Sequence, residues 1–446
     1  MVGPCYNQDM ENTALEIVKD LKDKGFETYF AGGTVRDLLL NKSPKDYDIV
    51  TSARPEEIED ILEHTIPIGK KFGVILAVKN GHNFEVATFR SDAAYSDGRR
   101  PDAVYFTDPK EDALRRDFTI NGMFYDPITK KVLDFVGGQE DLENKVLRFI
   151  GDSHERIVED NLRLLRAIRF KNSLNLDYAP GTFEAIQNNK ELIKNVSAER
   201  IQEELTKILT GKNPGQAFRE MSEAGILSII LPEVEALKGV KQPEIYHKEG
   251  DVFEHTLESL DALPGNSSKE LAWAVLLHDI GKPATFSVSD RIRFNKHAEV
   301  GSEMAGEIGK RLNFSNEMTA NLKWLVAHHM MFGNFFGMKK TRQAHWIHKP
   351  LFGELLELLR ADALGTKPKD LILYEELKRL ADEKELLLPK PEVLITGKEI
   401  INKFGIKEGP EIGKILDKVH HAQMEEKIRT KEEALKFAKE ILKNNF

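Results

Sequence analysis

The chain has 446 residues, of which 41% are hydrophobic and 31% charged, a composition typical of a folded protein of two to four domains. A net charge of −9 argues against coating nucleic acid through bulk charge, although a local basic channel stays possible. No apolar run approaches the roughly 18 residues needed to span a bilayer, and acidic residues near the N-terminus argue against a signal peptide. The lone cysteine, Cys5, excludes an internal disulfide, so we expect a cytoplasmic protein.

The first elements in chain order are a helix, a strand and a glycine turn. Apolar residues at helical spacing predict an amphipathic helix that ends near Gly25. The apolar run 29–31 then breaks at Gly32-Gly33, and a short helix follows. Glycine has no Cβ, so a phosphate chain can approach the backbone N–H groups of Gly32 and Gly33. Arg36 is close enough in sequence to help hold that anion.

Two carboxylates follow this turn. The segment Asp46-Tyr47-Asp48-Ile49 is predicted to be extended, so Asp46 and Asp48 share one face while Tyr47 and Ile49 face the core. Two adjacent carboxylates repel each other and need a cation, and their hard oxygens suit Mg²⁺. A metal clamp, a phosphate cradle and a positive charge are the parts of a phosphoryl-transfer site.

The stretch 29–51 resembles the first motif of class II tRNA nucleotidyltransferases and bacterial poly(A) polymerases, members of the DNA polymerase β-like superfamily. The resemblance implies an α+β fold: a nucleotidyltransferase head built on a mixed sheet with helices, then all-α neck, body, HD domain and tail. We expect the head over residues 1–143, neck and body over 144–246, the HD domain over 247–375 and the tail over 376–446.

Strands are predicted over 66–79 and 84–89, joined by a turn at Asn80-Gly81. The resemblance makes Glu85 a candidate for a third catalytic carboxylate, and a solvent-facing charge on an edge strand is an equal alternative. The polar segment 91–102 is predicted to be a mobile loop. The resemblance gives such a loop a part in reshaping the nucleotide pocket, with Arg99 and Arg100 near triphosphate or RNA; a solvated loop is the alternative.

The string LRRDFTIN matches the second motif of the family, with Gly122 in place of the usual alanine. It implies that Arg115 contacts phosphates, that Asp117 accepts a hydrogen bond from a ribose hydroxyl, and that Asn121 belongs to the nucleotide site.

Residues 157–170 are predicted to form one helix, on which Asp160 and Arg163 are neighbours. A plain helical salt bridge is one interpretation. The resemblance offers another, in which Asp160 and Arg163 read the Watson–Crick edge of incoming C or A and reject G and U. Arg166 is then placed to stack on the base, and Arg169 lies in the same nucleotide site.

A second group of candidates has the order of the HD superfamily, an all-α fold that binds one or two divalent metals. Its residues are His255, His278, Asp279 and Asp362, with His297 and His329 as further candidates. Imidazole and carboxylate ligands suit transition metals such as Mn²⁺, Fe²⁺, Ni²⁺ or Zn²⁺. Adjacent His278 and Asp279 converge on a metal only near a helix end, which Gly281 and Pro283 supply. Whether hydrolytic activity is retained stays open.

The lysine- and glutamate-rich C-terminal part resembles the tail of the same family, a helical module that holds tRNA. Its candidate phosphate contacts are Lys403, Lys407, Lys414 and Lys418.

The motifs together predict an enzyme that adds CCA to tRNA 3′ ends from CTP and ATP by two-metal phosphoryl transfer. Addition of A alone and poly(A) addition fit the same motifs. An alternative function of another class is that of a metal-dependent phosphohydrolase whose head only senses nucleotide. The expected partners are the tRNA acceptor end, CTP and ATP; the sequence does not give the oligomeric state.

Overall fold

The structure is a computed structural model that describes residues 4–93, 103–242, 250–387, 393–424 and 427–444. It divides into two compact units, residues 1–235 with 311–314 and residues 236–310 with 315–446. The predicted loop arginines, Arg99 and Arg100, lie outside the described residues. No helix of the described residues has the length and the apolar content that a membrane crossing requires.

The first unit begins with a mixed sheet of seven strands in the order β3-β4-β5-β2-β1-β8-β9. Neighbouring strands are antiparallel except β2 and β5, which are parallel. The strands are β1 (Thr28–Ala31), β2 (Ile49–Thr51), β3 (Thr65–Gly69), β4 (Val74–Lys79), β5 (His82–Thr88), β8 (Phe124–Asp126) and β9 (Lys131–Leu133). This confirms the predicted mixed sheet, although the predicted strand 66–79 is two strands separated by a 3-10 turn, η1 (Lys70–Phe72).

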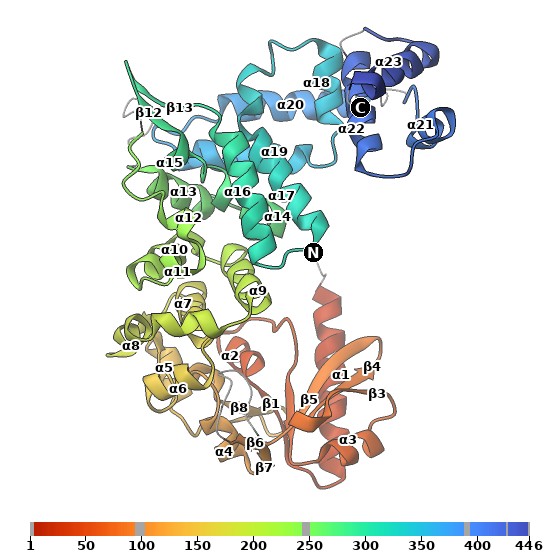
Figure 1. The fold of residues 1–446 in the computed structure, drawn as a ribbon. Helices are drawn as coiled ribbons and strands as arrows, with labels where there is room; N and C mark the ends of the chain where they lie inside the picture. The colour runs from red at the N-terminus through yellow and green to blue at the C-terminus, as the bar shows by residue number, and fades with distance from the viewer. Residues whose placement is uncertain (1–3, 94–102, 243–249, 388–392, 425–426, 445–446) are drawn as a thin grey trace. The chain divides into compact units, whose positions relative to one another are not determined.

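Helix α1 (Pro4–Asp23) packs on the sheet along strands β1, β2 and β5 (Figure 1). Its predicted apolar stripe is fully buried, as Ile17 and Leu21 show at 0% exposure. The predicted turn at Asn80-Gly81 is confirmed, with φ of 51° and 76° at the two residues. Such left-handed backbone suits a two-residue hairpin and is easiest for asparagine and glycine.

Shorter elements accompany the sheet in this part of the chain. They are α2 (Gly33–Leu39), α3 (Pro55–Ile61), β6 (Arg90–Asp92), β7 (Val104–Phe106), α4 (Pro109–Leu114), η2 (Thr119–Asn121) and α5 (Gly138–Glu143). The rest of this unit is mostly helical and also holds a two-stranded parallel sheet that the sequence did not predict. Its elements are β10 (Val146–Leu147), α6 (Ser153–Glu159), α7 (Arg163–Leu174), β11 (Asp177–Tyr178), α8 (Thr182–Asn188), η3 (Lys190–Asn195), α9 (Ala198–Leu209), α10 (Pro214–Glu223), α11 (Leu227–Ile230) and α12 (Pro232–Glu235).

In its described residues, the second unit contains helices and one hairpin, β12 (Phe286–Val288) with β13 (Ile292–Phe294). Its HD portion contains α13 (Val252–Asp261), α14 (Lys269–Leu277), α15 (Lys282–Thr285), α16 (His297–Arg311), α17 (Asn316–His328), η4 (His329–Asn334), α18 (Lys340–Ile347) and α19 (Phe352–Gly365). Helix α20 (Ile372–Leu387) follows, and then α21 (Gly397–Phe404), α22 (Pro410–Met424) and α23 (Lys431–Asn444) pack around a small core of their own, which includes Ile400, Ile415 and Val419.

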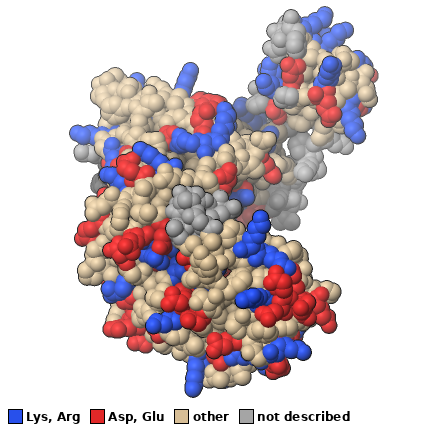
Figure 2. Space-filling model, turned by 60° about the horizontal axis from the view of Figure 1, so that its bottom comes forward, with Lys and Arg blue, Asp and Glu red and all other residues tan. Residues whose placement is uncertain are grey.

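Basic and acidic side chains are interspersed on the face shown in Figure 2. This agrees with the modest net charge of −9, and it means that an anion site must be built from local groups.

Candidate active site and metal cluster

A pocket of about 760 Å³ lies in the first unit. The predicted Mg²⁺ ligands Asp46 and Asp48 line it, and so do the nucleotide-binding residues predicted from the glycine turn, the second motif and the segment 157–170. Its walls come from the β1–α2 turn, the segment before β2, the α4–η2 connection and helix α7. The lining residues are Gly32, Gly33, Arg36, Lys45, Asp46, Asp48, Arg90, Asp92, Arg115, Arg116, Asp117, Asn121, Asp160, Arg163, Arg166, Arg169, Phe170 and Lys207.

Asp46 and Asp48 both line the pocket, but they precede strand β2 rather than lying within it. The prediction of a strand over these residues was therefore too long, although Tyr47 and Ile49 are buried as expected. The Thr34 hydroxyl fixes the segment, since it donates to the Asp46 carbonyl at 3.1 Å and accepts from the Asp48 N–H at 3.0 Å. The threonine at the start of α2 thus orients the two carboxylates, a role that the sequence pattern did not reveal.

The electrostatics at Asp48 fit a cation site. Desolvation by the surrounding protein, and next the negative charge of Glu85, raise the pKa of Asp48 to about 6; Asp46 adds to the shift, while Arg116 and Arg36 act against it. Glu85 lies on β5, the parallel neighbour of β2, so the structure brings the candidate third carboxylate into the field of Asp48. A bound divalent cation would relieve this repulsion, and hard carboxylate oxygens are the ligands that Mg²⁺ prefers.

Gly32 is required by its surroundings. Its φ of +62° is left-handed, and a Cβ there would lie 3.2 Å from a terminal nitrogen of Arg116 and 3.6 Å from Oδ2 of Asp48. Because Gly32 has no side chain, the space between the Arg116 guanidinium and the Asp48 carboxylate stays open. The proposed binding of a phosphate chain at this turn requires that space.

Arg115 and Arg116 are held by one buried carboxylate, Asp112, which is 0% exposed. Oδ1 accepts from Nε of Arg115 at 2.9 Å, and Oδ2 accepts from Nε of Arg116 at 3.1 Å. Burial acts to raise the pKa of Asp112, but the two guanidinium charges hold it below its usual range. Asp112 was not among the predicted site residues, although it lies three and four residues before Arg115 and Arg116, a spacing at which side chains on a helix meet.

Asp117 is buried and its acceptors are already engaged. Oδ1 accepts from the N–H of Phe118 and from the side chain of Asn121, and Oδ2 accepts from Nε of Arg166 at 2.9 Å. Although burial acts to raise it, the charge and hydrogen bonds of Arg166 lower the pKa of Asp117 to about 2. A ribose hydroxyl must therefore displace or share an existing partner of this carboxylate.

The prediction of one continuous helix through Asp160 and Arg163 was wrong. Helix α6 ends at Glu159, Asp160 has extended backbone angles, and α7 begins at Arg163. No ion pair joins the two side chains; Oδ2 of Asp160 instead accepts from Arg200 at 2.8 Å. The break takes Asp160 out of the helix and leaves Arg163 at the start of α7, and both residues line the pocket.

Arg163 is buried and held by acceptors on two sides. Its guanidinium donates to the Arg156 carbonyl and to Oε2 of Glu159, each at 2.7 Å, and to the Arg115 carbonyl at 3.1 Å. Three of its five N–H donors are thus used, and the remaining ones are available to a ligand in the pocket.

The ring of Phe170 packs against three arginines that line the pocket. Its ring centroid lies 5.3 Å from the guanidinium carbon of Arg36, 5.2 Å from that of Arg166 and 4.0 Å from that of Arg169. Arg169 also pairs with Glu204, a 1% exposed acid on α9 that the sequence analysis did not single out. These contacts fix positive charge along the pocket.

In the second unit, all six predicted HD residues converge. Oδ2 of Asp279 lies 3.2 Å from Nε2 of His278 and 3.8 Å from Nε2 of His255. On the other side, Oδ1 of Asp279 lies 3.5 Å from Nε2 of His297 and 3.8 Å from that of His329. Two overlapping sets of metal-ligand type therefore share Asp279.

Asp362 completes the first set, because its Oδ1 lies 2.9 Å from Nε2 of His255. Helix α14 ends at Leu277 with His278 as its C-cap, and this helix end, expected from the sequence, lets His278 and Asp279 point the same way.

The imidazoles are oriented as metal ligands require. Nδ1 of His278, His297 and His329 each lies 2.7–2.9 Å from a backbone carbonyl, to which Nδ1–H donates. This tautomer leaves each Nε2 lone pair facing Asp279. Burial lowers the pKa of His329 to about 4, which keeps that ring neutral near pH 7. The donor set fits a divalent transition metal.

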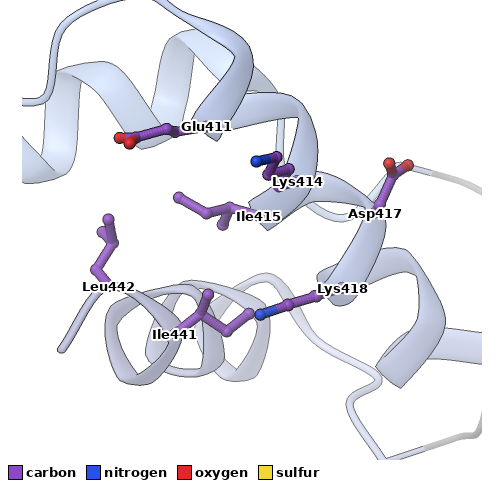
Figure 3. Close-up of a pocket in the computed structure, with 7 residues that line it drawn as sticks. All are labelled: Glu411, Lys414, Ile415, Asp417, Lys418, Ile441 and Leu442. Atoms are coloured by element: carbon purple, nitrogen blue, oxygen red, sulfur yellow. The ribbon is translucent and has the colours of Figure 1, made fainter. Parts of the chain in front are cut away.

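Two of the predicted tail lysines, Lys414 and Lys418, line a pocket between α22 and α23 (Figure 3). Its other lining residues include Ile415, Ile441 and Leu442, so its floor is apolar. The connection between α21 and α22 begins with Gly405, whose φ of 65° closes α21 in left-handed conformation.

The sheet and its pocket define a nucleotidyltransferase-type head, and the histidine cluster defines an HD domain. The "Poly A polymerase head domain" model matches residues 28–148, and the "Probable RNA and SrmB- binding site of polymerase A" model matches residues 175–238. The HD domain model matches residues 252–385. In these matched segments the chain is similar to poly(A) polymerases and tRNA nucleotidyltransferases, together with an HD domain.

Curated relatives include the CCA-adding enzyme of Staphylococcus aureus (strain MRSA252), 44% identical over 209 residues that cover 47% of this chain and 52% of the relative. The CCA-adding enzyme of Staphylococcus haemolyticus is 42% identical over 223 residues, 50% of this chain and 56% of the relative. The chain thus spans about half the length of the curated relatives it matches.

A solved structure, the Bacillus stearothermophilus CCA-adding enzyme in complex with CTP, matches with a TM-score of 0.66 and 26% identity. The match covers 97% of this chain and 98% of that one, so the likeness in fold extends through both units.

Proposed function

We propose that this protein is a template-independent RNA nucleotidyltransferase that adds C, C and A to tRNA 3′ ends from CTP and ATP. The observation that carries the proposal is the pocket itself, which joins the Asp46–Asp48 pair, the arginine cluster and the Asp160–Arg163 pair. Relatives named CCA-adding enzymes, one of them solved with CTP, support the choice of substrates.

Asp46 and Asp48 would hold Mg²⁺, with Glu85 as a candidate third carboxylate. When bound, two such ions lower the pKa of the terminal ribose 3′-OH and neutralise the triphosphate. The repulsion that raises the pKa of Asp48 to about 6 supports this assignment, because a cation would remove its cause.

The other residues bind and orient the nucleotide. Arg115 and Arg116, fixed by Asp112, face the triphosphate, and the Cβ-free turn at Gly32 and Gly33 lets it approach backbone N–H groups. At the opposite wall, Asp160 accepts from the exocyclic amine of C or A, and Arg163 donates to the ring acceptors beside it. G and U present the opposite pattern, so they would place an acceptor against Asp160 and a donor against Arg163.

The decisive experiment incubates the protein with tRNAs ending before CCA, after C and after CC, each with single NTPs, and resolves product lengths on a sequencing gel. We expect C on the first two substrates and A on the third. Addition of A alone would indicate an A-adding enzyme, and long A tracts would indicate a poly(A) polymerase. No extension of any substrate would contradict the proposal.

Two variants test the metal assignment. Asp46→Asn and Asp48→Asn should each lower C and A addition by several orders of magnitude, while binding of tRNA persists. Asp20→Asn is the control, since it removes a carboxylate that pairs with Lys79 outside the pocket. Near wild-type turnover in either pocket variant would contradict the assignment.

The histidine cluster favours a second candidate function, hydrolysis of a phosphate ester by a metal-dependent HD domain. Two ligand sets that share Asp279 are the arrangement a pair of divalent ions requires, and such ions activate water for attack on phosphorus. An intact head pocket argues against the alternative in which the head only senses nucleotide. We propose a cytoplasmic location for both activities, on the single cysteine.

A further inference from the structure

Lys282 is a buried cation directly beside the histidine cluster. It begins helix α15, is 8% exposed, and its Nζ lies 2.6 Å from Oδ2 of Asp279. A lysine is rarely buried unless its charge has partners, so the position needs an explanation beyond packing.

The partners of Lys282 leave one donor unused. Its ammonium has three N–H donors, of which one reaches Asp279 and one reaches Oε1 of Gln242 at 2.7 Å. The ring of Phe294, 5.3 Å from Nζ, offers a π face and no conventional acceptor. Among the described residues, the third donor therefore has no acceptor.

Gln242, like Lys282, has a side-chain donor without an acceptor. Its side chain is 5% exposed, and its oxygen accepts from Lys282, but its amide nitrogen has no hydrogen-bond partner among the residues that the structure describes. A buried donor without an acceptor is costly and rare. Two neighbouring buried groups thus offer unused N–H donors, one of them positively charged.

We propose that Lys282 and Gln242 form a phosphate-binding subsite at the edge of the histidine cluster, which receives the phosphoryl group of the HD substrate. This inference rests on the proposed HD hydrolase and names the residues that hold its substrate. A phosphate has only acceptors to offer when ionised, so it matches both donors, and Asp279 places the subsite next to the metal ligands.

A simpler role for Lys282 is to balance the charge of Asp279. That role accounts for the 2.6 Å contact with Asp279, but it does not account for the buried amide of Gln242, which lies next to Lys282 and has an unused donor. A bound phosphate satisfies both side chains at once.

The experiment measures binding of inorganic phosphate by calorimetry to the full chain, with and without Mn²⁺, while Mn²⁺ content is determined separately. The variants are Lys282→Met, Gln242→Leu and the conservative Lys282→Arg. Lys310→Met is the matched control, because it removes an exposed lysine that pairs with Glu307, away from the histidine cluster. Circular dichroism checks that each variant is folded.

We expect Lys282→Met and Gln242→Leu each to weaken phosphate binding tenfold or more with unchanged Mn²⁺ content, while Lys282→Arg and Lys310→Met stay within about threefold of wild type. Equal phosphate affinity in all variants, or no phosphate binding by the wild type, would overturn the subsite. If Lys282→Met loses Mn²⁺ as well as phosphate, the role of Lys282 is to balance the charge of Asp279, and the subsite is overturned. If the wild type binds no Mn²⁺ yet binds phosphate through Lys282, the hydrolase proposal fails and the subsite stands.

Discussion

Asp160 pairs with Arg200 across 2.8 Å and not with Arg163, the residue three positions further along the chain. The carboxylate sits at the end of α6 and the guanidinium comes from α9, so a neighbouring helix holds the acid for which we propose a base-reading role. Its second oxygen accepts from the N–H of Leu162 at 3.2 Å, which fixes the bend before α7.

Asp160→Ala should therefore change nucleotide choice more than chemistry, because the metal carboxylates remain. A hydrogen bond to a charged group contributes about 1.5–3 kcal/mol, so incorporation of UTP and GTP relative to CTP and ATP should rise roughly tenfold to a hundredfold. The measurement is single-nucleotide incorporation with all four NTPs. Arg200→Met is the control, since it removes the guanidinium that holds Asp160 but keeps the carboxylate oxygens of Asp160. It should lower the rate of addition and preserve the preference for C and A. An Asp160→Ala enzyme that still adds only C and A would contradict the base-reading role.

Asp112 leads to a prediction about affinity. Asp112→Asn removes the charge that anchors Arg115 and Arg116, so KM for CTP and for ATP should rise together, by tenfold or more, with unchanged base choice. Removing one partner of a buried pair also costs about 3 kcal/mol of stability. Steady-state kinetics and a melting curve report the two effects.

The control for that prediction is Asp108→Asn on the same helix. Asp108 caps α4 by accepting from two backbone N–H groups and touches neither arginine. It should lower the melting temperature and leave KM unchanged. If both variants show the same KM, the arginines do not depend on Asp112.

The motif residues were predictable because each motif is local in sequence. Gly32-Gly33, the Asp46–Asp48 pair and the His278-Asp279 pair each combine a turn or helix end with charged groups within a few residues, and local patterns report on such geometry. The residues that support them were not predictable. Glu204 and Arg200 act on partners that the fold brings to them, and nothing near them in sequence identifies those partners.

The break between α6 and α7 shows a second limit of prediction from the sequence. The apolar spacing through this segment fits one continuous helix, so periodicity alone predicted no interruption. Asn161 explains it in part: its side chain donates to the Ile157 carbonyl at 2.8 Å, a side-chain bond that competes with the helical ladder.

The pair of Asp117 and Arg166 predicts a pH dependence of stability. The pKa of Asp117 is about 2 in the folded chain and about 3.9 when unfolded, so the pair contributes on the order of 2 kcal/mol above pH 4. Because the folded pKa is the lower one, this contribution falls as the pH drops through 4 towards 2. Asp117→Asn should therefore unfold at lower urea than wild type at pH 7, with a gap that narrows on acidification. A gap that is constant from pH 7 to pH 3 would contradict the assignment.

The histidine cluster predicts metal retention in the second unit, independent of the head. Protein that is stripped with chelator and reloaded should hold transition metal, because three of the four imidazoles have their Nε2 presented by a backbone hydrogen bond at Nδ1. His278→Ala with Asp279→Ala should lose that metal while nucleotide addition continues. The control is His348→Ala, which alters a half-buried histidine outside both ligand sets. Elemental analysis of the three proteins decides the matter: equal metal content in all of them would mean that the cluster binds none.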